Sequence, residues 1–443
     1  MQDIDESDAL DQLASSVNSR RLAILCGAGL SMSAPSSLPS AWTLANRAKQ
    51  KYDAQYGHSR APLSEDIENQ AEFFFGREEL QTVYLRSLVD PNAFAGKPNH
   101  GHEAIADLTL ASCLAALTST NVDTLIEAAG LNLYGNVWPS IKLDQAATAP
   151  AEIAPLVKIH GCWNTDKPNT IWAPSQLASS PTKERVEELS DWLSQRMLNC
   201  DLLIVGFFTD WDYLNCLIEH CLTRVSPSKI FVVDPASSAD LLEKAPALAE
   251  AGARATTVFA HVRETGDSFL TKLRLQFSKS YVRQVLSPGL KAYREQFDAD
   301  ADPSLMNLDE IDNPSLWQLR RNIEGALPNQ PAQRHEPIEA PVLGFIIIRL
   351  LAAGATWDGP LLKLEDRFIR VIGASGKFVH DLEKSYSGSV PPGASPDVTI
   401  AVGAAQNFLP PDIARSSETE NIVRPASGQF CTDRDFEEVL EIA

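Results

Sequence analysis

The sequence has few features of a secreted, membrane-spanning or metal-binding protein. The N-terminus lacks an apolar signal core, and the longest apolar run, residues 342–356, is short and carries Arg349. We therefore expect a cytoplasmic protein with no membrane span. No two cysteines form a Cys-x-x-Cys pair, which argues against a disulfide framework and suits a reducing compartment. The seven cysteines are scattered at positions 26, 113, 162, 200, 216, 221 and 431.

Positive charge is also scarce. The chain has 38 Lys and Arg against 58 Asp and Glu, a formal net charge of −20, and no run of basic residues. Binding to a nucleic-acid backbone or an anionic membrane surface depends on clustered Lys and Arg. We therefore expect no direct contact with nucleic acid and no membrane binding.

The arrangement of apolar runs predicts an α/β fold. A chain of 443 residues is long enough for two or three domains. Short apolar runs alternate with helical patterns over the first 285 residues, which is typical of a Rossmann-like, doubly wound parallel sheet. The expected strands are residues 22–26, 113–117, 156–159, 202–206, 230–234 and 258–260.

The remaining segments predict three additions to this sheet. A helical stretch over residues 64–88, with the helix at 42–52, predicts a small helical insertion lobe. Residues 298–340 are rich in Asp, Pro and Asn, which predicts a linker over residues 286–340 with one helix near 317–323. Residues 341–443 contain apolar runs broken by Gly, Pro and Ser, which predicts a strand-rich or mixed C-terminal domain. We therefore expect a catalytic domain over residues 1–285, followed by the linker and this third part.

A glycine-rich loop follows the first expected strand. The strand at 22–26 ends at Gly27-Ala28-Gly29, and Ser31 follows. Glycines at such a turn let a ligand approach the backbone closely, and phosphates bind at this place in α/β sheets. A tight turn without a ligand is the alternative interpretation of this loop.

Other polar residues also stand just past expected strands, where such sheets bind ligands. Asn121 offers both a donor and an acceptor, and the alternative for it is a turn residue. His160 has an imidazole that titrates near neutral pH, and the alternative is a capping or core histidine. Gly206 and Asp234 end two further strands. The position of all these residues just past strand ends predicts a dinucleotide-binding site.

Four short motifs occur in the order that they have in the sirtuin superfamily. The region from about residue 15 to 285 resembles this superfamily, and it is most similar to the zinc-free bacterial sirtuin-like NAD hydrolases of anti-phage defence. The motifs are Gly27-Ala28-Gly29-Leu30-Ser31, Pro98-Asn99 before His102, Thr120 to Leu125 followed by Ala129-Gly130, and Lys158-Ile159-His160-Gly161.

The resemblance implies NAD⁺ as the substrate and gives roles to individual residues. Asn121 would hold the attacking water or a ribose hydroxyl, His160 would be the base at the nicotinamide ribose, and Asp123 would receive the nicotinamide carboxamide. The remaining roles concern binding: Gly27, Ala28, Gly29 and Ser31 would cradle the pyrophosphate, Gly206 would lie near the adenosine ribose, and Asp234 would bind ribose hydroxyls.

The chain departs from the deacylase sirtuins in several places. It lacks their two Cys-x-x-Cys zinc pairs, and Ser37 to Trp42 replaces their Gly-Ile-Pro-Asp-Phe-Arg segment without an arginine. Thr120 stands where they have glutamine. His100 and His102 form a His-x-His pair, but no further ligands follow at a recognisable spacing, so we expect no metal. Without the zinc module, water becomes the expected acceptor.

These observations predict an NAD⁺ glycohydrolase that acts as the effector of a bacterial anti-phage system. The alternatives are a non-catalytic module that binds NAD or ADP-ribose, and an NAD-dependent protein deacylase or ADP-ribosyltransferase. The resemblance implies a protein partner, either a translocase-type ATPase, a short Argonaute or a nucleotide-sensing protein, in a homo-oligomer or a hetero-complex. We expect the C-terminal part to regulate or assemble the enzyme.

Overall fold

The computed structural model of the chain divides into two compact units. It describes residues 1–57, 61–133, 135–207, 227–254, 258–327, 339–387, 395–405 and 428–442. The units are Met1–Leu273 and Arg274–Ala443, and the division falls within the 32-residue helix α11 (Gly266–Phe297). The sequence patterns did not predict this long helix. The division into parts at residues 285 and 340 stays a prediction.

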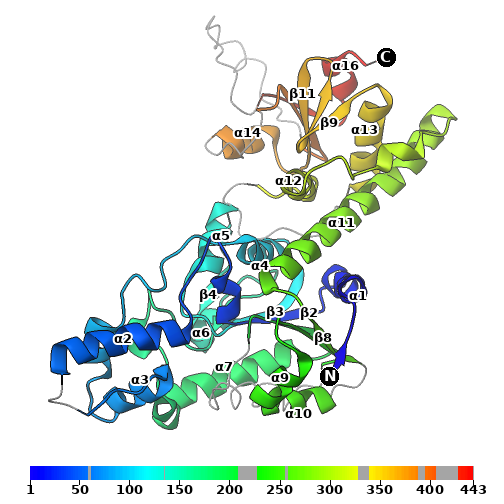
Figure 1. The fold of residues 1–443 in the computed structure, drawn as a ribbon. Helices are drawn as coiled ribbons and strands as arrows, with labels where there is room; N and C mark the ends of the chain where they lie inside the picture. Colours follow the sequence, from blue (N-terminus) through cyan, green and yellow to red (C-terminus); the bar gives the residue numbers. More distant parts are fainter. Residues whose placement is uncertain are drawn as a thin grey trace, which may run out of the picture. The chain divides into compact units, whose positions relative to one another are not determined.

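The first unit is built on an eight-stranded, fully parallel sheet (Figure 1). Its central strands lie in the order β5-β3-β2-β6-β7-β8. Successive strands are added on one side of β2 up to β5 and on its other side from β6 onward, so the strand order reverses between β2 and β6. This is the order of a doubly wound dinucleotide fold, and it confirms the predicted fold class. The strands are β1 (Gln2–Asp3), β2 (Leu22–Cys26), β3 (Leu114–Ser119), β4 (Pro139–Ser140), β5 (Leu156–Lys158), β6 (Asp201–Val205), β7 (Lys229–Val233) and β8 (Val258–Val262).

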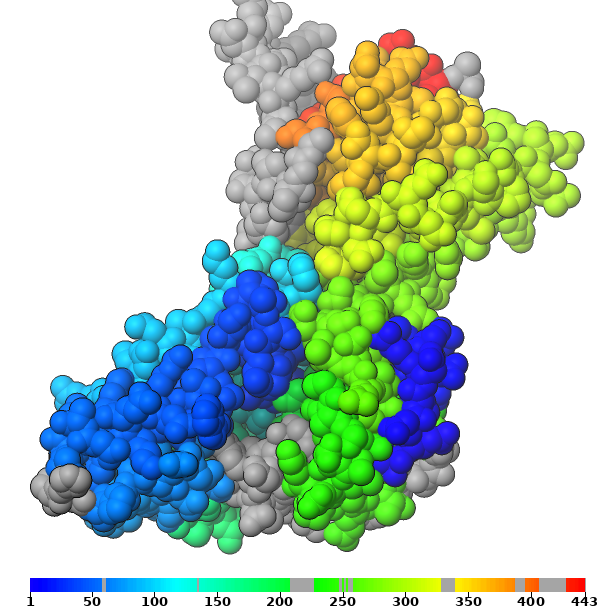
Figure 2. Space-filling view, in the orientation of Figure 1, coloured from blue at the N-terminus to red at the C-terminus, as the bar shows by residue number. Residues whose placement is uncertain are grey.

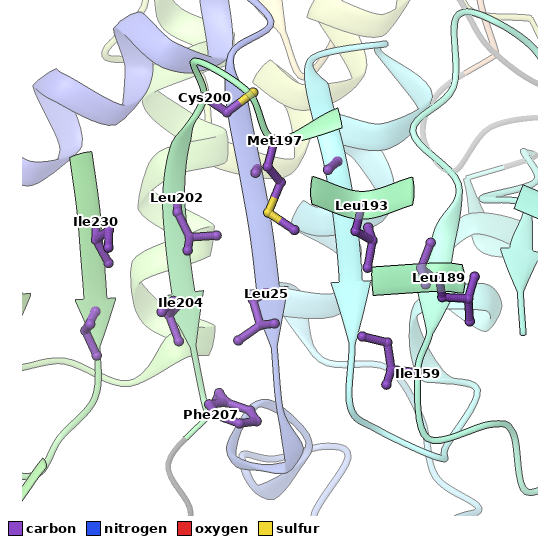
Figure 3. Packing of buried hydrophobic residues seen from close by; sticks show 14 of the residues in the cluster. Leu25, Ile159, Leu189, Leu193, Met197, Cys200, Leu202, Ile204, Phe207 and Ile230 are labelled. Atoms are coloured by element: carbon purple, nitrogen blue, oxygen red, sulfur yellow. The ribbon is translucent and has the colours of Figure 1, made fainter. Parts of the chain in front are cut away.

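Helices cover both faces of this sheet, which explains why β2 is continuously apolar, why β6 is apolar after Asp201, and why both strands are buried along their whole length. On one face lie α7 (Thr182–Arg196), α9 (Ser238–Lys244) and α10 (Pro246–Arg254), and on the other lie α1 (Glu6–Asn18), α4 (His100–Leu110) and the start of α11 (Figure 1). Figure 3 shows how strand side chains such as Leu25 and Ile204 pack with Leu193 and Met197 of the α7 region.

The predicted helical insertion follows β2, and its buried side chains form a hydrophobic cluster together with Trp163 and Trp172. It contains α2 (Ala41–Tyr56), α3 (Ile67–Phe75) and the π-helical turn η3 (Leu80–Leu88), shown in blue in Figure 2. Phe74 is fully buried there and stacks on Tyr84 at 5.2 Å between ring centroids. The expected helical stretch over residues 64–88 is present but divided in two, because the chain turns after α3 and Glu78 takes a positive φ of 60°.

The second unit contains a separate, mixed five-stranded sheet in the order β13-β12-β11-β10-β9. The last three strands in the sequence are parallel, and the first three are antiparallel. The expected mixed domain is therefore present, although its apolar run at 342–351 forms a helix. The elements are α12 (Asn313–Glu324), α13 (Ala340–Ala352), β9 (Thr356–Asp358), β10 (Leu361–Leu364), β11 (Arg367–Gly373), α14 (Val379–Ser387), β12 (Val398–Val402), β13 (Gln429–Thr432) and α16 (Phe436–Leu440).

In the described part of the chain, no helix combines the length and the apolar character that a bilayer crossing requires.

Candidate functional site

The loops after β2 and β6 pack against each other at the point where the strand order reverses. The Gly29 N–H donates to the Gly206 carbonyl at 2.8 Å, and the Gly27 N–H donates to the Val205 carbonyl at 3.0 Å. A Cβ on Gly27 or Gly29 would lie 2.7 or 2.9 Å from Gly206 backbone atoms. Close packing of the two loops therefore accounts for these glycines.

The exposed tip of the glycine loop is formed by Ala28 and Gly29. Ala28 is the first residue of the short 3-10 helix η1 (Ala28–Met32), so its N–H has no acceptor within the helix. The Gly27 and Gly29 N–H groups are already used between the loops. The pyrophosphate role of Gly27, Ala28, Gly29 and Ser31 stays a prediction.

Ser31 is the centre of a buried polar network. Its hydroxyl donates to Asp123 Oδ2 at 2.9 Å and accepts from Asn121 Nδ2 at 3.2 Å. His102 Nε2 lies 3.1 Å from the same oxygen. All four side chains are at most 6% exposed. Residues that are 71 to 92 positions away in the sequence therefore meet at one serine oxygen.

The hydrogen bonds of His102 determine which ring nitrogen carries the proton. The Asn99 N–H donates to His102 Nδ1 at 3.2 Å, so the proton is on Nε2, which donates to Ser31. Burial lowers the pKa of His102 to about 4, although the charges of Asp123 and Asp267 oppose this shift. The imidazole is therefore neutral at pH 7. It orients Ser31 and is not an acid at that pH.

Asn121 and His160 lie beyond the ends of neighbouring strands. Ser119 of β3 pairs with Lys158 of β5, and each candidate residue follows two positions later. Asn121 Oδ1 is buried and, among the described residues, has no hydrogen-bond partner, whereas its Nδ2 is fixed by Ser31. Burial, and then the charge of Arg185, lower the pKa of His160 to about 3, against a hydrogen bond with the Thr120 backbone.

Asp123 is held from both sides of its carboxylate. One oxygen accepts from the Ser31 hydroxyl and the other from the Leu125 N–H at 3.0 Å. This second bond begins α5 (Leu125–Asn132). Each oxygen keeps a second lone pair with which it can accept from a ligand amide.

A buried lysine holds the loop that carries Asp123. Lys158 is 1% exposed, and its Nζ donates to the Asp123 carbonyl oxygen and to Glu127 Oε1 at 2.7 Å. Burial alone would lower the pKa of Lys158, but the charge of Glu127, the hydrogen bond to it and the charges of other neighbours together outweigh burial, so the pKa is raised. The ammonium therefore stays charged and ties β5 to the start of α5.

Asp234 follows β7, two strands away from β2, and its carboxylate accepts from the Ala236 N–H at 2.8 Å. The network around Ser31 therefore does not include it, and its ribose role stays a prediction. Arg185, in α7, has a buried Nη1 with no partner in the described ranges, while its Nη2 donates to the Asn169 carbonyl.

Neither histidine of the His-x-His pair is arranged for a metal. His100 is exposed and its Nδ1 lies 3.3 Å from Glu103, whereas both nitrogens of His102 bond to Asn99 and Ser31. No group of three or more candidate ligands occurs in the part of the chain that the structure describes.

Three contributors were not among the site residues that the sequence predicted: His102 as an orienting group, Lys158 and Arg185. A signal existed for Lys158, because a charged residue within the apolar run 156–159 is rarely buried unless it is paired. Arg185 lies on a polar helix surface in the sequence, and no pattern distinguished it from its neighbours.

Comparison with known proteins identifies part of this unit. Residues 115–255 match the family model of the SIR2-like domain. The match includes Asn121, Asp123 and His160, and it ends before the second unit. A comparison with curated proteins finds no match.

Solved structures of Sir2 homologues are also similar to this chain. One is a serine-to-alanine variant in complex with ADP-ribose, with 16% identity and a TM-score of 0.36, covering 61% of this chain and 98% of that one. Another is a Sir2 homologue in complex with NAD, with 15% identity and a TM-score of 0.35, covering 61% of this chain and 94% of that one.

Proposed function

We propose that the chain is an NAD⁺ glycohydrolase, which cleaves NAD⁺ to nicotinamide and ADP-ribose. The observation that carries this proposal is the state of Asn121. Its amide nitrogen is fixed by Ser31, and its buried amide oxygen has no partner among the described residues. An oriented acceptor of this kind is suited to hold a water molecule or a ribose hydroxyl in line for attack.

In the proposed reaction, the bond between the nicotinamide nitrogen and the ribose carbon breaks, and nicotinamide leaves with the electron pair. The water oxygen bonds to that carbon, and its proton passes to His160 and then to solvent. His160 is neutral at pH 7 because its pKa is lowered to about 3 by burial and by Arg185. A neutral imidazole with this lowered pKa is a weak base. It therefore takes the proton from the water only as positive charge develops on the ribose and makes that water more acidic. Asp123 accepts from the carboxamide and orients the leaving group.

The test is incubation of the purified protein with NAD⁺, alone and with proteins from neighbouring genes, followed by chromatography of nicotinamide and ADP-ribose. His160→Ala and Asn121→Ala should each lower the rate by roughly 10²–10⁴. The exposed His100→Ala is the control and should keep the rate. A folded His160→Ala with wild-type turnover would contradict the assignment.

The same assay separates the alternatives. Tight NAD⁺ binding without cleavage under every condition favours a binding module. Consumption of NAD⁺ only with an acylated peptide or an acceptor protein favours a deacylase or an ADP-ribosyltransferase.

We further propose that the enzyme is an effector of bacterial anti-phage defence and depletes NAD⁺ on activation. Every described side chain of the Ser31 network lies in the first unit, while the second has its own sheet and core. We assign residues from about 290 onward to regulation or assembly with a partner. Truncation near residue 290 should change the basal rate, the stimulation by a partner or the mass in light scattering. An unchanged set of all three would refute the regulatory role.

A further inference from the structure

The first turn of α11 lies against the loop and the helix that hold Ser31. The Asp267 carboxylate accepts from the Gly101 N–H at 2.7 Å, at the start of α4. The two backbones are close together, because a Cβ on Gly101 would lie 3.0 Å from Asp267 Cα and 2.7 Å from Leu30 Cδ1. Leu30 and Gly101 directly precede two members of the Ser31 network in the sequence. The contact with α11 therefore adjoins this network.

The Asp267 carboxylate satisfies a donor that α4 cannot satisfy by itself. The first N–H groups of a helix have no acceptor within it, and the helix dipole favours a carboxylate at that end. The next N–H, of His102, donates to Asn99 Oδ1 at 3.1 Å, and Asn99 Nδ2 donates to the Leu30 carbonyl at 2.8 Å. The position of the His102 ring, which bonds to Ser31, therefore depends on both side-chain acceptors.

The same helix continues to Phe297, and its later turns are held within the second unit. The guanidinium carbon of Arg274 lies 3.9 Å from the centroid of the Trp317 ring in α12. Ser278 Oγ accepts from Arg320 Nε, also in α12, at 3.2 Å. All four side chains are buried. Rotation of α11 against α12 would therefore break contacts between buried polar groups, which is costly.

A second helix of this unit, α13, also holds α11. Gly289 of α11 and Gly344 of α13 leave no room for a side chain, since a Cβ on either glycine would overlap the backbone of the other helix. Helices packed this closely cannot slide past each other without repacking. A displacement of α12 or α13 therefore displaces the helix that carries Asp267.

We propose that Asp267 is a positioning residue for the Ser31 network, and that the second unit controls the site through α11. Movement of α11 takes the carboxylate away from the Gly101 N–H, which shifts His102 and its hydrogen bond to Ser31. The other members of the network share that serine hydroxyl, so their alignment with NAD⁺ changes as well. This inference rests on the proposed function, because it takes the Ser31 network as part of the NAD⁺ site.

The first test removes the acceptor at the start of α11. Asp267→Ala should lower kcat about tenfold and change KM for NAD⁺ less than about threefold, because alignment is lost while the binding groups remain. Asp267→Asn keeps an acceptor oxygen and should recover most of kcat. An Asp267→Ala protein with the wild-type kcat overturns the proposal.

The matched control is Asp66→Ala. Asp66 is also half-buried, and its carboxylate accepts from the Asn69 N–H at 2.8 Å at the start of α3. The change therefore removes the same kind of bond from another helix of the first unit. We expect a comparable loss of stability with unchanged kcat and KM, which separates positioning from a general structural role.

Hydrogen–deuterium exchange tests the same link without turnover. Loss of a helix-terminal acceptor loosens the first turn locally, and amide exchange reports such opening. Asp267→Ala should speed the exchange of residues 27–31 and 99–105 by about fivefold or more. Asp66→Ala should leave the exchange of both segments unchanged.

The contact between α11 and α13 tests control by the second unit. Gly344→Ala should speed the exchange of residues 99–105 about threefold or more, although residue 344 belongs to the other unit. Ser278→Ala removes the acceptor of Arg320 and is a smaller perturbation that should act in the same direction. The control is Gly376→Ala, which strains a positive φ of 75° in the second unit but whose Cβ meets nothing within 4 Å. It should leave this exchange unchanged.

A double change identifies Asp267 as the link. If the coupling passes through this carboxylate, Gly344→Ala should add nothing to the exchange rate of Asp267→Ala. An additive double change shows that the second unit acts by another route and overturns the proposal. The same holds if neither Gly344→Ala nor Ser278→Ala alters the exchange of residues 99–105. Exchange needs no turnover, so a protein that never cleaves NAD⁺ refutes the proposed function, whereas these exchange rates decide the role of α11.

Discussion

The Ser31 hydroxyl donates a hydrogen bond to Asp123 across 2.9 Å, and this bond joins the loop after β2 to the loop after β3. Both side chains are almost completely buried. The same oxygen accepts from Asn121 and His102, so four polar groups are satisfied only when the two loops and α4 are assembled together. A serine at this position therefore has a structural role.

Ser31→Ala should destabilise the first unit and lower the rate of NAD⁺ consumption. The change leaves the His102 and Asn121 donors buried without their acceptor, which costs about 1–3 kcal/mol. Urea denaturation measures the loss, and the half-buried Ser33→Ala is the matched control, with an expected effect of at most about 0.5 kcal/mol. Equal stability of the two variants would show that the network contributes little.

The free energy of unfolding should decrease as the pH falls below 6.5. Burial lowers the pKa of His102 to about 4, from an ordinary value of 6.5. Between these values the unfolded chain binds a proton that the folded chain does not, so acid favours unfolding. The contribution of the neutral His102 to the free energy of unfolding is fully present above pH 6.5 and is lost as the pH falls towards 4. For His102 alone it amounts to about 3 kcal/mol.

Urea denaturation at a series of pH values from 7 to 5 measures this pH dependence of the free energy of unfolding. His102→Asn keeps a neutral donor and should show a shallower dependence than the wild type. His100→Asn changes an exposed histidine of the same helix and should show the wild-type slope. If His102→Asn has an unchanged slope, the histidine does not titrate as the burial argument requires.

Much of the first unit could be predicted because strand ends coincide in parallel sheets. Gly27, Asn121, His160, Gly206 and Asp234 were expected just past strands, and the structure places each of them there. The six predicted strands are all present. Local runs of apolar residues contain this information, since strands buried on both faces are continuously apolar.

The contacts inside the site could not be predicted in the same way. Ser31 bonds to residues 71, 90 and 92 positions away, and no local pattern shows which partners share its oxygen. The apolar run at 342–351 illustrates another limit, because its length suits either a strand pair or the helix that it forms. Lys158 belongs to the Lys158-Ile159-His160-Gly161 motif, but its partner Glu127 could not be predicted, because the pairing depends on where α5 begins.

Lys158→Met should lower both stability and turnover, because it removes the support of the Asp123 loop. Nζ of Lys158 pairs with Glu127 at 2.7 Å, and the two side chains are 1% and 16% exposed. Removal of one partner from a buried pair costs about 3 kcal/mol. The double change Lys158→Met/Glu127→Leu should regain part of this. Because the lysine acts through Asp123, kcat should decrease more than the affinity for NAD⁺.

The control for Lys158 is a surface pair on α7. Lys183 lies 3.9 Å from Glu187, with side chains 60% and 51% exposed, so Lys183→Met should cost less than about 1 kcal/mol. A Lys158→Met protein that matches Lys183→Met in urea and keeps its kcat would rule out a supporting role.

Gly206→Ala should damage the site more than the same change at Gly57. Both glycines have positive φ, +58° and +52°, so alanine is strained at each by roughly 1–3 kcal/mol. At Gly57 a Cβ meets nothing within 4 Å, whereas at Gly206 it meets the backbone nitrogen of Leu30 at 2.4 Å. Backbone cannot rotate away as a side chain can, so Gly206→Ala must separate the loops after β2 and β6. We expect a larger loss of stability than for Gly57→Ala, together with a loss of NAD⁺ cleavage that Gly57→Ala does not show. If the two variants behave alike in urea denaturation and in turnover, close packing between the loops is not what requires glycine at residue 206.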